Sequence, residues 1–252
     1  MQRTVFTNYL RDFFSIEKIK DASLNGMQVE GAGSFDSIVC AVDTSDAVID
    51  FAIANNAQCI VVHHGLFWGK QLPLDGVLAA RLRKLFAHGI NLYAVHLPLD
   101  MHLTVGNNKA VMNAIEIPDV RQLFDYGGFA MGLIGTYAQP QPISSITTAL
   151  ETHFGTVKHS IIKHDSVSSV CVITGDAFSI IDDVLRSPAE LFISGELTHA
   201  MYYPYQESGK SGIFIGHYAS EKGGMQLFAD HLRTAPSVSG TKILFYDNDT
   251  GL

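Results

Sequence analysis

Cysteine is scarce in this 252-residue chain, and its placement excludes two kinds of cysteine site. The three cysteines, Cys40, Cys59 and Cys171, are far apart, odd in number and located inside apolar runs. Such cysteines are typical of reduced thiols in a protein core, so we expect neither a disulfide framework nor a CxxC metal site. The cysteine pattern predicts a cytoplasmic protein. The expected N-terminal helix is not followed by a small-residue cleavage site, so the sequence does not suggest secretion.

Basic residues and long apolar runs are also lacking. Lys and Arg number 17 against 25 Asp and Glu, which gives a formal net charge of -8, and the basic residues form no cluster. This balance argues against general nucleic-acid binding, because phosphate backbones require clustered positive charge. No segment approaches the roughly 20 apolar residues of a membrane span. The phosphate-binding pattern GxxxxGK[ST] does not occur either, so no motif supports triphosphate binding.

The apolar pattern predicts alternating strands and helices. After an amphipathic N-terminal helix, in which Val5, Phe6, Tyr9, Leu10, Phe13 and Phe14 share one face, the order is β-α-β-α-β. We expect strands at 37–42, 58–63 and 91–96 and helices at 45–55 and 76–88. This alternation is typical of an α/β protein with mixed or parallel sheets flanked by helices, in which ligands bind at the carboxyl edge of the sheet.

The second half of the chain repeats this order. An ungapped comparison places Cys40 over Cys171 and His63 over Ser194, a constant offset of 131 (171 − 40). Further on, His96 lies over His217 at an offset of 121 (217 − 96). We therefore expect two similar, pseudo-duplicated lobes, 1–125 and 126–252, with a metal site in the cleft between them. The boundary is soft, and the lobes are expected to be able to exchange elements. GGFAMGLIGTY near the boundary is expected to form a strand.

Histidines follow the second predicted strand. The segment CIVVHHGLFWG places His63 and His64 directly after an apolar run. Adjacent strand residues point to opposite sides, so this pair is better suited to two metal ions than to one. An isolated pair of this kind can also have a purely structural role, in which His63 packs in the core and His64 caps a turn.

Two further segments place histidine and a carboxylate at strand ends. Asp100 stands between His96 and His102 in HLPLDMH, and His217 precedes Glu221 in GHYASEKGG, where Ser220 and Glu221 are expected to open a helix. Taken singly, each segment also fits a helix with an acidic first turn. Together they favour a dinuclear centre of imidazole and carboxylate, which suits Zn²⁺, Fe²⁺, Mn²⁺ or Co²⁺.

Five motifs, in order, make the chain resemble the NIF-three-like family (NGG-one-interacting-factor three), whose members are labelled GTP cyclohydrolase type-two homologues. They are SLNGMQVEG (23–31), VVHHGLFW (61–68), HLPLDMH (96–102), SGELTHA (194–200) and GHYASEKGG (216–224). The resemblance covers nearly the whole chain. It implies that His63, His64, Asp100, His217 and Glu221 are the metal ligands. It also implies a toroidal homohexamer with its sites facing the interior.

The resulting hypothesis is a metal-dependent hydrolase in which two divalent ions activate a water molecule. Glu196, His96 and His199 are the candidates for proton transfer, and the substrate is a small molecule. The family label suggests opening of the guanine ring of GTP. The alternative is a noncatalytic, hexameric metal-binding scaffold or regulator, whose ions would be fully ligated by protein.

Overall fold

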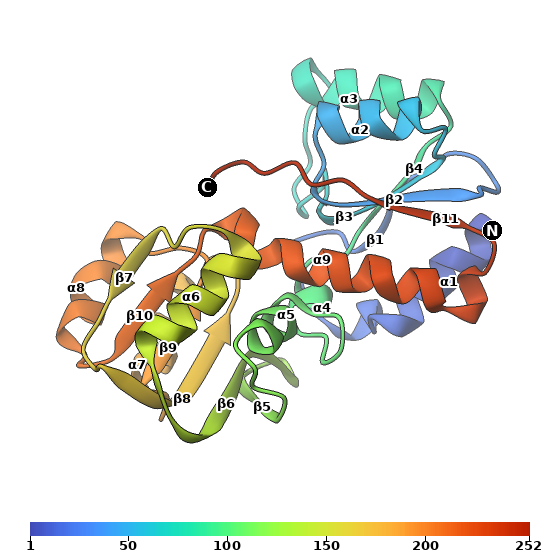
Figure 1. Cartoon of the computed structure of the whole chain (residues 1–252). Coiled ribbons are helices and arrows are strands. Elements are labelled where there is room, and N and C mark those ends of the chain that lie inside the picture. The colour runs from blue at the N-terminus through green and yellow to red at the C-terminus, as the bar shows by residue number, and fades with distance from the viewer. The chain divides into compact units, whose positions relative to one another are not determined.

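The protein divides into two compact units. The computed structural model describes residues 1–252 (Figure 1). Unit 1 contains Met1–Leu99 and Met225–Asn248, and unit 2 contains Asp100–Gly224 and Asp249–Leu252. The chain passes between the units in α4 (Leu97–Asp100), in α9 (His217–Thr234) and again between Asn248 and Asp249, so α9 supplies residues to both.

Unit 1 contains a five-stranded mixed sheet. Its strand order is β1 (Gly26–Val29), β4 (Asn91–Ala94), β3 (Cys59–His64), β2 (Ser37–Asp43) and β11 (Lys242–Phe245). The last four strands are parallel, and β1 pairs antiparallel with β4 at one edge. The carboxyl ends of β2, β3 and β4 therefore lie along one edge of the sheet, where the sequence predicts a site.

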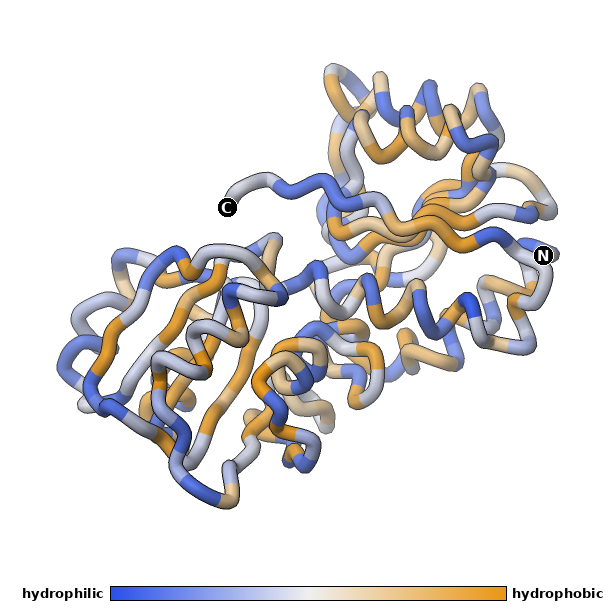
Figure 2. The backbone as a smooth tube through the Cα atoms, viewed as in Figure 1, coloured by the Kyte–Doolittle hydropathy of each residue, from blue (hydrophilic) through white to orange (hydrophobic).

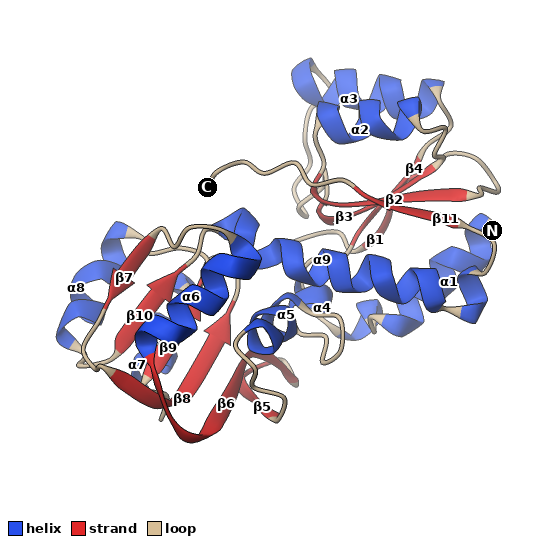
Figure 3. Ribbon diagram, viewed as in Figure 1, coloured by secondary structure: helices blue, strands red, loops and turns tan.

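Helices pack on both faces of this sheet (Figure 3). On one face, α2 (Asp46–Ala54) and α3 (Gly76–Ala87) share a core with the strands that includes Val39, Ile60 and Leu92. On the other face, Phe6 of α1 (Arg3–Phe13) meets Tyr93 edge to face, with ring centroids 5.4 Å apart. Because Tyr93 alternates with Leu92 and Ala94 along β4, its side chain points away from α2 and α3.

Unit 2 contains a six-stranded mixed sheet. Its strand order is β5 (Val120–Tyr126), β6 (Phe129–Pro142), β8 (Ser166–Ile173), β9 (Leu191–Ser194), β10 (Ser211–Phe214) and β7 (His159–Ile161). The three central strands β8, β9 and β10 are parallel, and β7 pairs antiparallel with β10 at the edge. Figure 2 shows hydrophobic residues along these strands, which are buried between two layers of helices.

Two separate cores cover the two faces of the second sheet. Val170, Leu191 and Ile213 pack with α5 (Asn107–Ala114) and α6 (Ile143–Phe154). Cys171, Phe192 and Phe214 pack with α7 (Ile181–Arg186) and α8 (His199–Glu207) on the opposite face. Short 3₁₀ helices complete the chain at Ile16–Lys18, Phe178–Ile180 and Pro236–Val238.

The predicted duplication is visible in the topology. β1, β4, β3 and β2 of unit 1 correspond in order and direction to β7, β10, β9 and β8 of unit 2. The outer neighbour differs, because β11 is parallel to β2 whereas β6 is antiparallel to β8. The expected fold class, two similar α/β lobes with mixed sheets flanked by helices, is confirmed.

The register of the repeat differs by one residue from the sequence comparison. Asn91 donates its N–H to the carbonyl of Gln58, and Ser211 donates in the same way to Glu190. These pairs give offsets of 132 (190 − 58) and 120 (211 − 91), not 131 and 121. A slip of one residue exchanges the two faces of a strand. Under the observed register, His64 corresponds to Glu196 of unit 2.

The predicted elements of the first half are confirmed within one or two residues at most ends. Two details differ. Val5 is 52% exposed, so the buried face of α1 is narrower than expected and centres on Phe6 and Leu10. The helix of the last motif begins at His217 and not at Ser220, which makes His217 and Glu221 neighbours one turn apart in α9. No helix combines the length and apolar character that a membrane crossing requires.

Three helices end in the same C-terminal motif. After α2, α3 and α5, the residue that follows the C-cap takes a positive φ angle, and the next residue returns its N–H to the last turn. This is the Schellman arrangement, which favours glycine because L-residues rarely adopt positive φ. The three positions are occupied by Asn56 (φ 52°), Gly89 (φ 60°) and Glu116 (φ 59°).

Candidate metal centre

The two histidines at the end of β3 are each oriented by a hydrogen bond at Nδ1. His63 is fully buried, and its Nδ1–H donates to the carbonyl of Val95 at 2.9 Å. Nδ1 of His64 lies 2.8 Å from Oδ1 of Asp43, at the end of the neighbouring strand β2. Because a carbonyl and a carboxylate only accept, both histidines carry their proton on Nδ1. The lone pair of the neutral ring is then on Nε2.

His96 is oriented in the same way, just after β4. Its Nδ1 lies 3.0 Å from Oδ1 of Asp21, and its backbone N–H donates to the side-chain oxygen of Asn25. Asp21 also accepts the N–H of Leu97. Burial alone would raise the pKa of Asp21, but the hydrogen bond and positive charge of His96, with further donors from Asn25 and Ser23, lower it to about 2. Asp21 is thus an ionised carboxylate that holds His96.

These three histidines form one cluster within unit 1. The ring centroid of His63 lies 4.5 Å from that of His64 and 5.0 Å from that of His96. The centroids of His64 and His96 are 5.6 Å apart. One nitrogen from each ring lies within 4.8 Å of the others, so the group could hold a metal ion. A metal-ligating histidine characteristically donates its other N–H to a carboxylate or carbonyl, as all three do here.

The loop after His64 is fixed by Gln28. Its side-chain oxygen accepts the backbone N–H groups of Leu66 and Phe67, and its amide donates to the carbonyl of Phe67. A Cβ at Gly65 would collide with this amide, so glycine is required there. The same loop carries Trp68, whose ring meets His96 edge to face at 4.9 Å.

Unit 2 holds Asp100 through two donors. The amide of Asn107 donates to Oδ1 at 2.8 Å, and the hydroxyl of Thr174 donates to the same oxygen at 3.2 Å. Asn107 is fully buried and also accepts the N–H of Gly224. Asp100 therefore has a defined orientation at the start of unit 2.

His217 lies between two carboxylates in unit 2. Its Nδ1 is 2.5 Å from Oε1 of Glu196, and its Nε2 is 3.1 Å from Oε1 of Glu221. Burial lowers the pKa of His217, but the hydrogen bonds and negative charges of Glu221 and Glu196 outweigh it and raise the pKa to about 9. Glu221 is 2% exposed. A Cβ at Gly175 would overlap its carboxylate, so a glycine makes room for Glu221.

Two further histidines of the sequence motifs, His102 and His199, have other surroundings. His102 caps a turn, because its Nδ1 accepts the backbone N–H groups of Thr104 and Val105. His199 is exposed at the first residue of α8. In unit 1, the cluster includes His96 together with His63 and His64.

Sequence reasoning did not identify four residues that orient the site: Asp21, Asp43, Asn107 and Thr174. Asp43 offered a signal, because it ends β2 on the same sheet edge as His64. Asp21 and Thr174 offered none, since Asp21 is 75 positions from His96 and Thr174 is 74 positions from Asp100. Asn107 follows Asp100 by only seven positions, but no sequence pattern pairs the two.

Comparison with known proteins places the chain in a family. The model of the family described as Duf34/NIF3 (NGG1p interacting factor 3) matches residues 1–251. A protein of Pyrococcus horikoshii named GTP cyclohydrolase 1 type 2 homolog is 36% identical over 254 residues, covering 100% of both chains. The chain belongs to the NIF3 family. A second relative of the same name, from Archaeoglobus fulgidus, is 32% identical and covers 97% of each chain.

Solved structures similar to this NIF3 chain agree with its fold. The structural-genomics protein ybgI, of unknown function, superposes with a TM-score of 0.92 at 29% identity and covers 100% of both chains. TTHA1606 from Thermus thermophilus superposes with a TM-score of 0.89 at 32% identity, again with full coverage.

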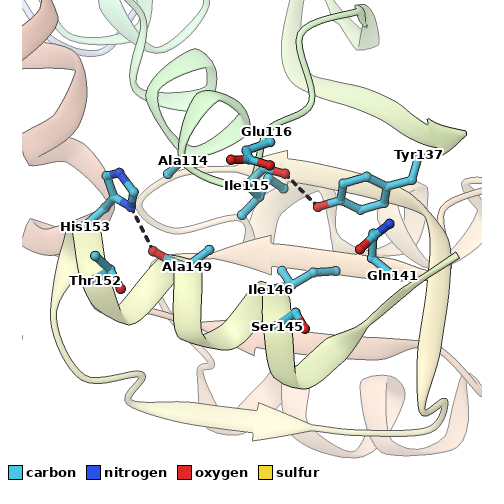
Figure 4. Close-up of a pocket in the computed structure, with 10 residues that line it drawn as sticks. All are labelled: Ala114, Ile115, Glu116, Tyr137, Gln141, Ser145, Ile146, Ala149, Thr152 and His153. Carbon is cyan, nitrogen blue, oxygen red and sulfur yellow. Dashed lines mark hydrogen bonds between the residues drawn. The ribbon is translucent and has the colours of Figure 1, made fainter. Parts of the chain in front are cut away.

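This NIF3-family chain also has a cavity of about 370 Å³ in unit 2 between α5, α6 and β6 (Figure 4). The hydroxyl of Tyr137 donates to the carbonyl of Ile115 at 2.8 Å, and Nδ1 of His153 donates to the carbonyl of Ala149. Burial, with the nearby charge of Glu116, raises the pKa of Tyr137 to about 12. These polar groups support the backbone around the cavity and are separate from the residues described above.

Proposed function

We propose that this NIF3 chain is a metal-dependent hydrolase that uses two divalent ions. The proposed ligands are His63, His64, Asp100, His217 and Glu221. The observation that carries the proposal is the histidine cluster of unit 1. There, three imidazoles converge and each is held at Nδ1 by an acceptor, so that Nε2 is the nitrogen suited to a metal.

The donor set of each unit fits a divalent ion of borderline character. Unit 1 supplies imidazole nitrogens, and unit 2 supplies an imidazole and two carboxylates, whereas all three thiols are buried in the cores. Nitrogen and oxygen donors without thiolate suit Zn²⁺, Fe²⁺, Mn²⁺ or Co²⁺. Bound ions of this kind supply Lewis acidity and lower the pKa of water.

The chain's own residues orient the ligands and provide groups for proton transfer. Asp43 and Asp21 hold the rings of His64 and His96, and Glu196 holds His217. His96, Glu196 and His199 remain the candidates for proton transfer. His96 and Glu196 are each in hydrogen-bond contact with a second ionisable group, which allows a proton to pass between the two members of the pair.

The first substrates to test are nucleotides and phosphoesters. The names of the relatives suggest GTP as one member of the panel. Turnover would be measured with metal-loaded protein, with chelator-treated protein and with His64→Ala. Lys163→Ala, which changes an exposed side chain, is the matched control.

The proposal expects turnover that needs the metal and falls at least about 100-fold in His64→Ala, in line with the loss of a ligand. Turnover that persists without metal would contradict it. Full metal loading without turnover of any substrate would favour the noncatalytic scaffold.

We also propose that the chain forms a homohexamer with its sites facing the interior of a ring. The support is family membership. Light scattering on the purified protein would test this, and a stable monomer would contradict it.

A further inference from the structure

A second cavity in unit 2 shares a wall with the proposed centre. It has a volume of about 410 Å³, which is in the range of small-molecule sites. Its lining includes His217 and Glu196 as well as Lys158 and His159. The cavity therefore connects a proposed metal ligand with a basic side chain.

Lys158 supplies a positive charge whose hydrogen-bond partner is neutral. Its Nζ donates to the backbone carbonyl of Gly251 at 2.9 Å, and it forms no ion pair. The backbone of Lys158 is fixed, because its N–H donates to the carbonyl of Phe214 at the end of β10. His159, the first residue of β7, is exposed beside it.

One acidic side chain, that of Glu196, lines this cavity, and its carboxylate is already hydrogen-bonded. Glu196 accepts from Nδ1 of His217 at 2.5 Å. Lys158 and His159 therefore give the cavity the character of an oxyanion site, since both offer N–H donors.

The segment Asp249–Leu252 reaches this cavity with its last two residues. Gly251 and Leu252 form part of its lining. Gly216, which has a φ of 101°, allows this close approach, because a Cβ there would stand 2.9 Å from the backbone oxygen of Leu252. The carbonyl of Gly251 takes the position at Lys158 that an oxyanion would take.

We propose that this cavity binds the oxyanion group of a small-molecule substrate through Lys158 and His159, and that the segment Asp249–Leu252 competes for the same place. The inference rests on the proposed function, because it assigns the substrate class of that site. The substrate carries a phosphate or a carboxylate at one end and presents its reacting group toward His217. The segment leaves Lys158 when the substrate binds.

The test uses metal-free protein, so its outcome is independent of whether the chain binds metal or hydrolyses anything. Lysines are acetylated with a limiting amount of an N-hydroxysuccinimide ester, in inorganic phosphate, in acetate or in chloride of equal ionic strength. Mass spectrometry then gives the labelling of each lysine. Lys163, which is exposed and outside the cavity, is the internal control.

We expect phosphate or acetate to slow the labelling of Lys158 saturably and to leave Lys163 unchanged. The anion that protects Lys158 at the lower concentration shows whether the site prefers a phosphate or a carboxylate. His159→Leu, which removes the N–H donor, should raise the half-protecting concentration about tenfold, as expected for the loss of one hydrogen bond to a charged group.

A variant that lacks residues 249–252 should lower the half-protecting concentration. Gly251→Pro is the second variant, because proline cannot adopt the φ of 75° at this position and the segment would be displaced without shortening the chain. Equal protection of Lys158 and Lys163, or an unchanged half-protecting concentration in both segment variants, would overturn the proposal.

Discussion

Oδ1 of Asp43 lies 2.8 Å from Nδ1 of His64, and the two residues are direct partners in the parallel pairing of β2 with β3. The hydrogen bond therefore joins the ends of two neighbouring strands. It determines which nitrogen of His64 carries the proton and fixes the rotation of the ring.

Replacing this carboxylate should weaken metal binding. In Asp43→Asn the acceptor is neutral and less able to increase the basicity of His64, so we expect metal affinity to fall about 10- to 100-fold. Competition with a chromophoric chelator measures this. Asp46→Asn, which changes an exposed partner of Lys84, should retain full affinity. Equal affinities in the two variants would show that Asp43 does not support the ligand.

The Asp21–His96 pair should make the stability of the metal-free protein depend on pH. The pKa of Asp21 is about 2 in the folded protein and 3.8 when unperturbed, so its contribution is present above about pH 4 and is lost as the pH falls toward 2. Relative to Asp21→Asn, the wild type should be more stable by about 2 kcal/mol near neutral pH.

Urea unfolding of both proteins from about pH 6 down to about pH 3 tests this. The difference in the free energy of unfolding should shrink as the pH falls. A difference that is constant across this range would mean that the charge of Asp21 is not involved.

The three thiols should be unreactive in the native protein. Burial raises the pKa of Cys40 and of Cys171 to about 12, and burial also raises the pKa of Cys59. Since the thiolate is the reactive form, a disulfide reagent near pH 8 should label none of them until denaturant is added. Reaction of any cysteine at its unfolded rate in native protein would contradict the described core.

Glycine at position 116 should stabilise the protein. Glu116 occupies a helix C-terminal position with a φ of 59°, where a side chain is unfavourable. We expect Glu116→Gly to raise the free energy of unfolding by about 1 kcal/mol. Asn56→Gly is the matched control. It should gain less, because asparagine tolerates this conformation. A larger gain at position 56 would refute the explanation.

Strand ends could be predicted from the sequence because apolar runs that stop at a polar pair mark them directly. His63 and His64 do end β3, and the β-α-β-α-β order is correct. The repeat was aligned one residue out of register, because apolar residues on both faces of a buried strand give no signal of which face is which. The strand pairings, together with the hydrogen bonds of Asn91 and Ser211, establish the register.

The residues that orient the ligands were harder to predict. Asp21 reaches His96 from a loop before β1, across 75 positions of the chain. A lone aspartate in a loop resembles any solvated acid until tertiary structure brings a partner to it. The start of α9 at His217 was missed for a related reason, since the extra turn is held by the backbone of Gly216, which accepts from Ser220.

The sheet of unit 1 is completed by β11, whose Ile243 pairs with Ile38 of β2. A ribosome delivers β11 last, after every strand of unit 2 has emerged. The nascent chain can therefore assemble the six-stranded sheet while β2 still exposes an unpaired edge. An open edge is a template for pairing with other chains, so the interval before β11 emerges is a stage of biosynthesis that favours aggregation.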